Sequence, residues 1–147
     1  MSAAQSRATF LAVAACLAVL CATVLPWIRS GATRRSAFAL ARGADALGFI
    51  DSPGRRALLV VWYLLPFLTA ATWTAAALRR AGVVALLAAL VGGMSTAAGI
   101  VVMVWVRAEP GPVLAVVAGA AAVVCATLVV LAGRDARGDI AIEGGRT

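Results

Sequence analysis

The chain has 147 residues, of which 63% are hydrophobic and only 13% charged, and its mean hydropathy is +1.00. Soluble globular domains carry about 25% charged residues, so this composition excludes an ordinary soluble domain. All 13 basic residues are arginine, against six acids, and there is no histidine or lysine. The missing residue types exclude histidine-based acid–base catalysis, histidine metal ligands and Schiff-base lysine chemistry within this chain.

All 19 charged residues fall outside four apolar stretches, which define the predicted elements. In chain order these stretches are 9–28, 57–78, 83–106 and 113–132. About 20 apolar residues in a helix span the roughly 30 Å hydrocarbon core of a bilayer. The runs do not alternate in polarity as the strands of a membrane barrel do. We therefore predict an all-α membrane protein, an up-down bundle of four transmembrane helices that forms a single transmembrane domain over 1–147.

The first stretch also has features of a secretory signal, because Arg7 precedes it and Val13–Cys16 looks like a lipoprotein cleavage box. The apolar run continues unbroken to Val24, however, so cleavage would leave an apolar stub instead of a polar linker. We therefore predict that the first helix is retained.

The connection 29–56 is the one long loop, with six arginines and two acids (6 − 2 = +4). Its middle is predicted to form a short helix on the bilayer surface, with Arg34, Arg35 and Arg42 on the polar side. Phe38 is expected to stack on Arg42 or to dip into the interface. One interpretation is that these four residues contact anionic headgroups or an acidic partner. The other is that the arginines flank helix ends and snorkel to lipid.

Four aromatic residues are predicted to lie near helix ends on the face opposite the N-terminus. Tryptophan and tyrosine prefer the boundary between water and lipid. We therefore expect interface anchors at Trp27, Trp62, Tyr63 and Trp105.

Small residues at four-residue spacing let transmembrane helices approach closely. The third stretch has the clearest such stripe, which includes Ala89, Gly93 and Ala97, and Gly92 belongs to a neighbouring stripe. Glycine in a helix interior costs about 1 kcal/mol of helix propensity, which favours a packing role for the Gly92–Gly93 pair. Whether this packing is internal or between chains stays open.

The ends of the chain bear on orientation and order. The tail 133–147 carries three arginines and three acids among glycines, and it is predicted to be disordered. Counting arginines for the positive-inside rule gives six on the face of the N-terminus and seven on the other. We favour cytoplasmic termini, in the plasma membrane of a bacterium.

Four short segments carry a resemblance to a known group of proteins: Leu25–Gly31, Arg35-Ser36, Arg55-Arg56 and Trp62–Pro66. Over the first half of the chain, they resemble uncharacterised four-helix integral membrane proteins of high-GC actinobacteria. The resemblance implies a location in the cell envelope and adds no activity.

The predicted helices contain no charged side chain, whereas transporters and proton relays generally need one at membrane depth. The three cysteines have no paired metal-ligand spacing, so no catalytic, cofactor or metal site is predicted. We predict a non-enzymatic accessory or scaffold component of a membrane complex. Its partners would be the bilayer and other membrane proteins or itself, not nucleic acid. The alternative is a small oligomeric transporter or channel subunit, with a pathway formed by Gly92, Gly93 and the hydroxyls of the second and third helices.

Overall fold

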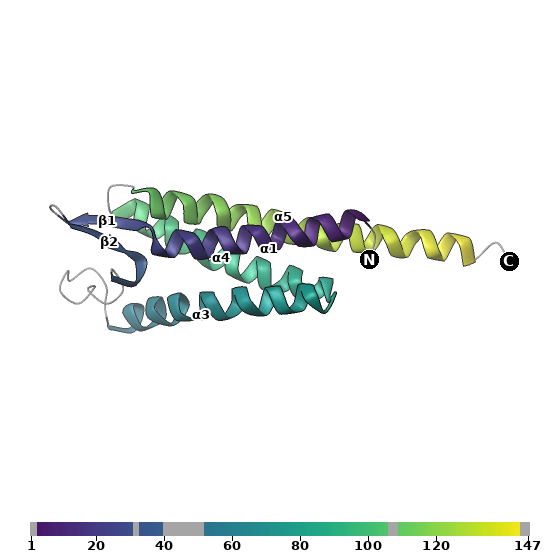
Figure 1. Ribbon diagram of the computed structural model, residues 1–147, viewed down its shortest axis with the longest axis horizontal. Coiled ribbons are helices and arrows are strands. Elements are labelled where there is room, and N and C mark those ends of the chain that lie inside the picture. Colours follow the sequence, from purple (N-terminus) through teal and green to yellow (C-terminus); the bar gives the residue numbers. More distant parts are fainter. Residues whose placement is uncertain (1–2, 31–32, 40–51, 106–108, 145–147) are drawn as a thin grey trace.

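The computed structural model describes residues 3–30, 33–39, 52–105 and 109–144. Within these residues it contains four long helices and one antiparallel pair of strands (Figure 1). The elements are α1 (Ala3–Val24), β1 (Pro26–Ser30), β2 (Thr33–Ser36), α3 (Ser52–Ala77), α4 (Ala81–Trp105) and α5 (Pro110–Gly144). All four helices are long and apolar enough to cross a membrane. The prediction of a mainly helical chain with four apolar spans is therefore confirmed.

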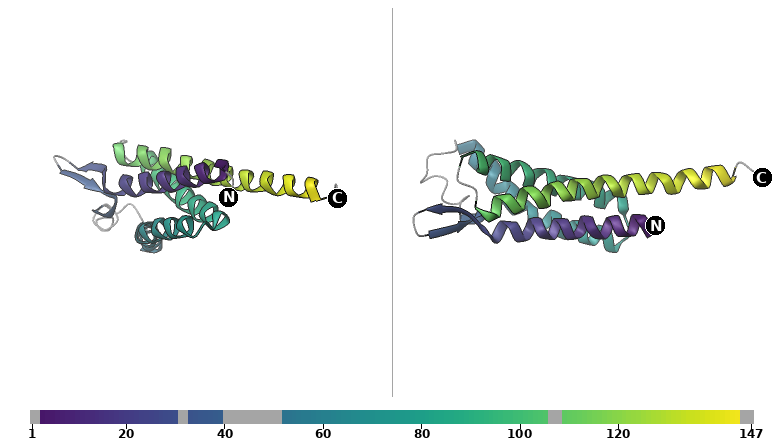
Figure 2. Two further views of the ribbon diagram at one scale, coloured as in Figure 1. Left: turned by 45° about the vertical axis from the view of Figure 1, so that its right-hand side comes forward. Right: turned by 90° about the horizontal axis from the view of Figure 1, so that it is seen from above.

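Helix α5 makes the most extensive contacts in the bundle, with α4 and with α1, and α3 lies against α4 and α1. The end of α1 lies beside the start of α5, where Gly111 meets Trp27, and the start of α1 lies beside Gly133 of α5. These two helices therefore run in opposite directions. Figures 1 and 2 show the same arrangement, with α5 continuing well past the start of α1.

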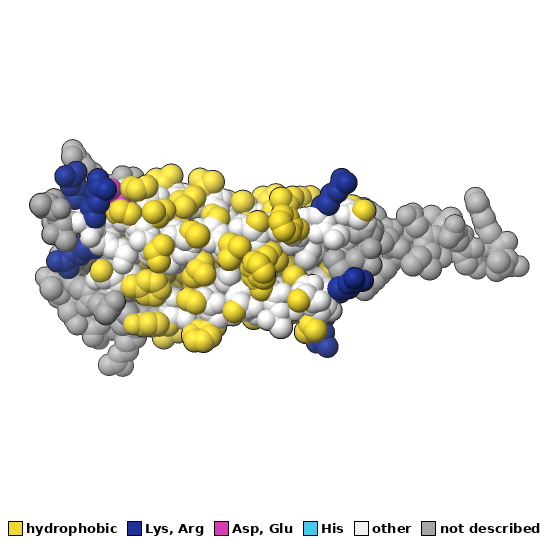
Figure 3. All heavy atoms as spheres, in the orientation of Figure 1, with side chains coloured by type: hydrophobic (Ala, Val, Ile, Leu, Met, Phe, Trp, Pro, Cys, Tyr) yellow, Lys and Arg dark blue, Asp and Glu magenta, His cyan; other side chains and the backbone are white. Residues whose placement is uncertain are grey.

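The surface of the helices is apolar between two charged ends (Figure 3). Phe10 is 72% exposed and Phe67 73% exposed, although a soluble protein would gain free energy by burying such side chains. The arginine side chains visible in Figure 3 gather at the ends, and the band between them is hydrophobic or uncharged. A surface of this kind is typical of a membrane-embedded protein, for which lipid is the solvent.

The interior is built from small side chains, which lets the helix backbones approach closely. Each long helix except α3 contributes mainly alanine and valine to the buried core, as Ala12, Ala88 and Ala122 illustrate. The Ser95 hydroxyl of α4 donates a 3.1 Å hydrogen bond to the Ala115 carbonyl of α5. This bond crosses between helices and fixes their register at that level.

The structure corrects the predicted end of the first helix and the loop that follows it. The helix ends at Val24, and residues 26–30 form β1 instead of its last turn. Proline at 26 does not favour continuation of a helix, because its ring clashes with the preceding turn. The surface helix predicted over residues 34–49 is wrong for residues 34–36, which pair with β1 in strand β2 and so satisfy their backbone groups. Residues 37–39 are helical, as predicted. Residues 40–49 of that prediction lie outside the described residues.

The predicted disorder of the tail is wrong for residues 133–144, which continue helix α5. The sequence suggested disorder because glycines alternate with balanced charges there. Extending an existing helix needs no new nucleus, and a span of 25 residues ending at Arg134 already supplies one. About ten further residues carry the helix roughly 15 Å beyond that span.

Candidate functional site

The β1–β2 hairpin is fixed to the helices by one buried tryptophan. Trp27 is completely buried, and its Nε1–H donates a 2.7 Å hydrogen bond to the Ala22 carbonyl at the end of α1. Its ring meets Trp62 of α3 edge to face, with centroids 4.6 Å apart and planes at 86°. The strand register shifts between Pro26 and Ile28, so Trp27 sits at a bulge, a feature that re-aims a side chain.

Helix α5 completes this anchoring point with a glycine. A Cβ atom on Gly111 would lie 2.5 Å from Cδ1 of Trp27 and 2.6 Å from the carbonyl oxygen of Pro26. Only a residue without a side chain leaves room for the indole. One side chain thus ties the hairpin to α1, α3 and α5 together.

This burial corrects two of the four predicted interface anchors. Trp27 and Trp62 are 0% and 1% exposed, so they pack on each other and do not face lipid headgroups. The sequence placed them correctly near helix ends, but it did not show that the indoles fill the space between helices. Tyr63 is 55% exposed, and its contact with a bilayer interface stays a prediction. The side chain of Trp105 lies outside the described residues.

The hairpin carries three exposed arginines beyond the ends of the helices (Figure 1). Arg29 on β1 is directly opposite Arg34 on β2, and Arg35 is opposite Ile28. Like charges directly opposite each other on neighbouring strands repel. No acidic residue occurs in the first 44 positions of the chain, but Glu109 stands two residues before Gly111, which contacts Trp27. Figure 3 shows one acidic side chain beside the arginines at this end. Three exposed arginines outnumber that acid, so the hairpin is a net cationic surface that favours a bound anion.

The other two predicted contact residues are Phe38 and Arg42, of which the structure describes only Phe38. Phe38 is half-buried, and its ring centroid is 6.1 Å from that of Tyr63 on α3. The expected stacking partner, Arg42, lies outside the described residues. The structure therefore brings Arg34 and Arg35 together on one strand and places Phe38 against the helical bundle.

The two adjacent glycines of α4 have different surroundings. A Cβ on Gly92 would collide with the backbone carbonyl of Gly119 on α5, and would lie 2.9 Å from Cγ2 of Val123. A Cβ on Gly93 would meet nothing within 4 Å, and that residue is exposed. Gly92 therefore packs against α5, whereas Gly93 makes no such contact within this chain, and its packing against a second chain stays a prediction.

Ala89 and Ala97, the other members of the predicted stripe, also differ in burial. Ala89 is half-buried against the core, whereas Ala97 is exposed. The contact with α5 uses the neighbouring face of α4 instead, through Gly92, Ser95 and Gly99. A helix has one face for each neighbour, and the sequence alone did not show which stripe faces α5. Gly92 faces α5 and Gly93 faces outward, and the predicted alternative of a pathway in an oligomer stays a prediction.

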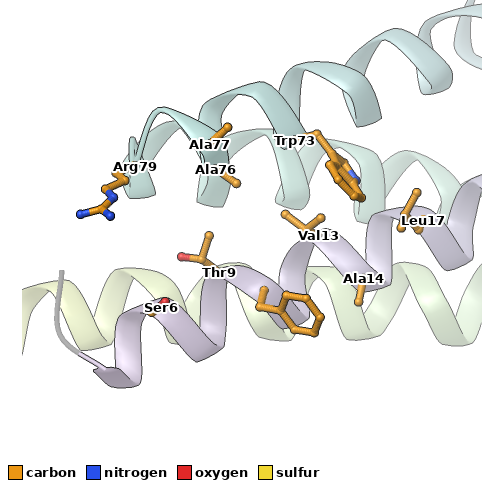
Figure 4. A pocket seen from close by; sticks show the side chains of 10 residues that line it. Ser6, Thr9, Val13, Ala14, Leu17, Trp73, Ala76, Ala77 and Arg79 are labelled. Atoms are coloured by element: carbon orange, nitrogen blue, oxygen red, sulfur yellow. The ribbon is translucent and has the colours of Figure 1, made fainter.

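An open apolar groove of about 780 Å³ lies between α1 and the last turns of α3 (Figure 4). Trp73 extends from α3 toward α1, and it is 51% exposed. Arg79 lies at the opposite end of the groove from Leu17 (Figure 4). The lining residues are Ser6, Thr9, Phe10, Val13, Ala14, Leu17, Trp73, Ala76, Ala77 and Arg79.

Arg79 terminates α3 in an unusual conformation. Its φ angle is +55°, in the left-handed region that glycine normally occupies at the end of a helix. Its N–H donates to the Ala76 carbonyl (3.0 Å), and the N–H of Arg80 donates to the Ala75 carbonyl (2.9 Å). This pair of bonds is a Schellman cap. A left-handed arginine costs free energy that glycine would not, so its presence points to a use for the side chain.

The sequence did not reveal this groove, although two signals for it were present. Arg79 and Arg80 occupy a tight turn that has no acidic residue between 52 and 108. Trp73 of α3 stands six residues, or roughly 9 Å, before Arg79 in the turn that ends this helix. The gap itself depends on how α3 leans against α1, which follows from packing and not from a local pattern.

Most hydroxyls of the described helices bond to the carbonyls of their own helix, as Thr9, Thr23 and Thr72 do. Among the described residues, the buried polar atoms without a partner belong to Trp62, Thr69 and Thr96. No group of three or more metal-ligating side chains occurs in that part of the chain. The hydroxyls mainly satisfy local backbone groups.

No family model matches this chain, and no curated protein or solved structure matches it. The resemblance of its first half to actinobacterial membrane proteins stays a hypothesis.

Proposed function

We propose that this chain is a non-enzymatic, multi-pass protein of the bacterial plasma membrane that serves as an accessory or scaffold component. Its helices would cross the bilayer four times, up and down. In this proposal the β1–β2 hairpin presents its arginines to an acidic surface at the membrane boundary. That surface belongs to a partner membrane protein or to anionic headgroups.

The observation that carries this proposal is the pairing of Arg29 with Arg34 on a hairpin that is firmly anchored. Two opposed guanidinium groups repel unless an anion lies between or beside them. Trp27 holds the hairpin to three helices, so little conformational entropy of the backbone is lost when the arginines bind. A cationic site that is preorganised in this way suits a stable docking contact.

We further propose that both termini lie in the cytoplasm. The hairpin would then face the opposite side of the membrane, where the arginines would contact the outer leaflet or an extracytoplasmic partner. The helical extension of α5 would project into the cytoplasm, past the level at which α1 begins (Figure 2).

Replacing the opposed pair by glutamine, as R29Q/R34Q, should abolish the co-purification of a stoichiometric partner in mild detergent. The change removes the charge of both side chains but keeps a polar side chain that can still donate hydrogen bonds. Co-purification followed by partner identification measures the effect. If the pair contacts headgroups instead, the same variant should lose the dependence of vesicle binding on anionic lipid.

The matched control removes two arginines of α5 from the other end of the molecule, as R134Q/R137Q. It lowers the net charge by the same amount and should leave partner recovery and lipid dependence unchanged. Loss of binding in both variants would indicate a general charge effect. Binding that survives R29Q/R34Q would contradict the scaffold proposal.

A further inference from the structure

The groove between α1 and α3 is about as long, measured along α1, as one bilayer leaflet is thick. Its lining on α1 runs from Ser6 to Leu17, eleven residue steps, or roughly 16 Å at 1.5 Å per residue. Half of a hydrocarbon core of roughly 30 Å is about the same length. Its volume of about 780 Å³ is within the range of about 300–1,000 Å³ typical of ligand sites.

The two ends of the groove differ in chemistry in the way that the two ends of a phospholipid do. The deep part is lined by Val13, Leu17 and Trp73, all apolar. The mouth is marked by Arg79, with Arg80 next to it in the turn. An acyl chain fits the first environment and a phosphate the second.

The charge at the mouth has no acidic counterpart on the helices that form the groove. Helix α1 contains no acidic residue, and α3 and α4 contain none. The acids at this end of the molecule belong to the extension of α5, at positions 135, 139 and 143. An anion at the groove therefore meets the arginines and no acid of α1, α3 or α4.

The geometry points to a binding site for one anionic phospholipid, with an acyl chain between α1 and α3 and the headgroup phosphate at Arg79. This inference rests on the membrane placement proposed above, and it adds a specific ligand class at the end opposite the hairpin. The left-handed backbone of Arg79 supports it, because glycine would make the same cap without strain, but it has no guanidinium.

Quenching of Trp73 by brominated lipids provides the test, because bromine quenches indoles that touch the labelled acyl chain. The protein is reconstituted in unlabelled phosphatidylcholine with a low fraction of brominated phosphatidylglycerol or of brominated phosphatidylcholine. The fluorescence of the W73F variant comes from the other three tryptophans, and it is subtracted from that of the wild type to leave the contribution of Trp73. We expect brominated phosphatidylglycerol to quench Trp73 with about fivefold higher apparent affinity, which corresponds to about 1 kcal/mol for one arginine at a membrane surface.

Variants at Arg79 test the contact with the lipid headgroup, and a variant in the lining of the groove tests the contact with the acyl chain. R79G suits the left-handed backbone and should remove the preference for phosphatidylglycerol, whereas R79K should keep it. Ala14 lines the groove and is exposed, so A14F should reduce quenching by either lipid at low fraction. The control is A121F on an exposed position of α5, outside the groove, and it should behave as the wild type.

Four results would overturn the inference. Equal quenching by both lipids, or a preference that survives R79G, would show that the groove does not select an anionic headgroup. A change of oligomeric state in A14F without a change in quenching would identify a second copy of the chain as the occupant. Absence of quenching by any brominated lipid would contradict the membrane placement itself.

Discussion

Alanine at Gly92 is expected to lower the free energy of unfolding by about 2 kcal/mol, within the range found for overpacked interiors. The added Cβ would meet the carbonyl oxygen of Gly119 on α5, and a backbone atom cannot rotate away as a flexible side chain can. The two helices would have to separate along their contact. Titration with SDS in mixed micelles measures the unfolding free energy.

The adjacent glycine gives a matched control with the opposite expected sign. A Cβ on Gly93 meets no atom within 4 Å, so G93A should raise the unfolding free energy by up to about 1 kcal/mol through helix propensity alone. The two variants differ by one position and add the same methyl group. Equal effects at both positions would contradict the close contact of α4 with α5.

Alanine at Trp27 is expected to cost about 3–5 kcal/mol of stability, the range for large aromatic side chains removed from a protein interior. The variant loses the edge-to-face contact with Trp62 and leaves a cavity above Gly111. It should also release the hairpin from α1, α3 and α5. Thermal unfolding in detergent micelles measures the stability, and protease digestion reports the release of the hairpin.

Two milder variants test the details of that anchoring point. W27F keeps an aromatic ring but loses the bond from Nε1 to the Ala22 carbonyl, which should cost about 1 kcal/mol. G111A should destabilise as well, because its methyl group would overlap the indole. A W27A protein of unchanged stability would show that the hairpin is not anchored through this side chain.

The four spans were predictable because the hydropathy of a membrane helix is a property of the segment itself. Each apolar stretch in the sequence lies almost entirely within one long helix of the structure. The exception is the end of the first stretch, where Pro26 and Trp27 begin a strand. The hydropathy of an apolar residue is the same whether the residue faces lipid or fills the space between two helices.

The candidate sites were predictable in part, for a related physical reason. Arginines in the long loop pointed to the hairpin, but the direct pairing of Arg29 with Arg34 depends on strand register. The choice of Gly92 over Gly93 depends on the rotation of α4 about its axis, and the groove depends on the tilt of α3. Register, rotation and tilt arise from contacts between segments, so no local pattern reports them.

Reporter fusions placed at Ala46 and at the C-terminus test the central claim, a chain that crosses the membrane four times. After one span the loop should lie outside the cytoplasm, and after four spans the C-terminus should lie inside it. We therefore expect a translocated reporter at Ala46 and a cytoplasmic one at the end. Both reporters in the same compartment, or a fusion protein recovered in soluble form, would contradict the claim.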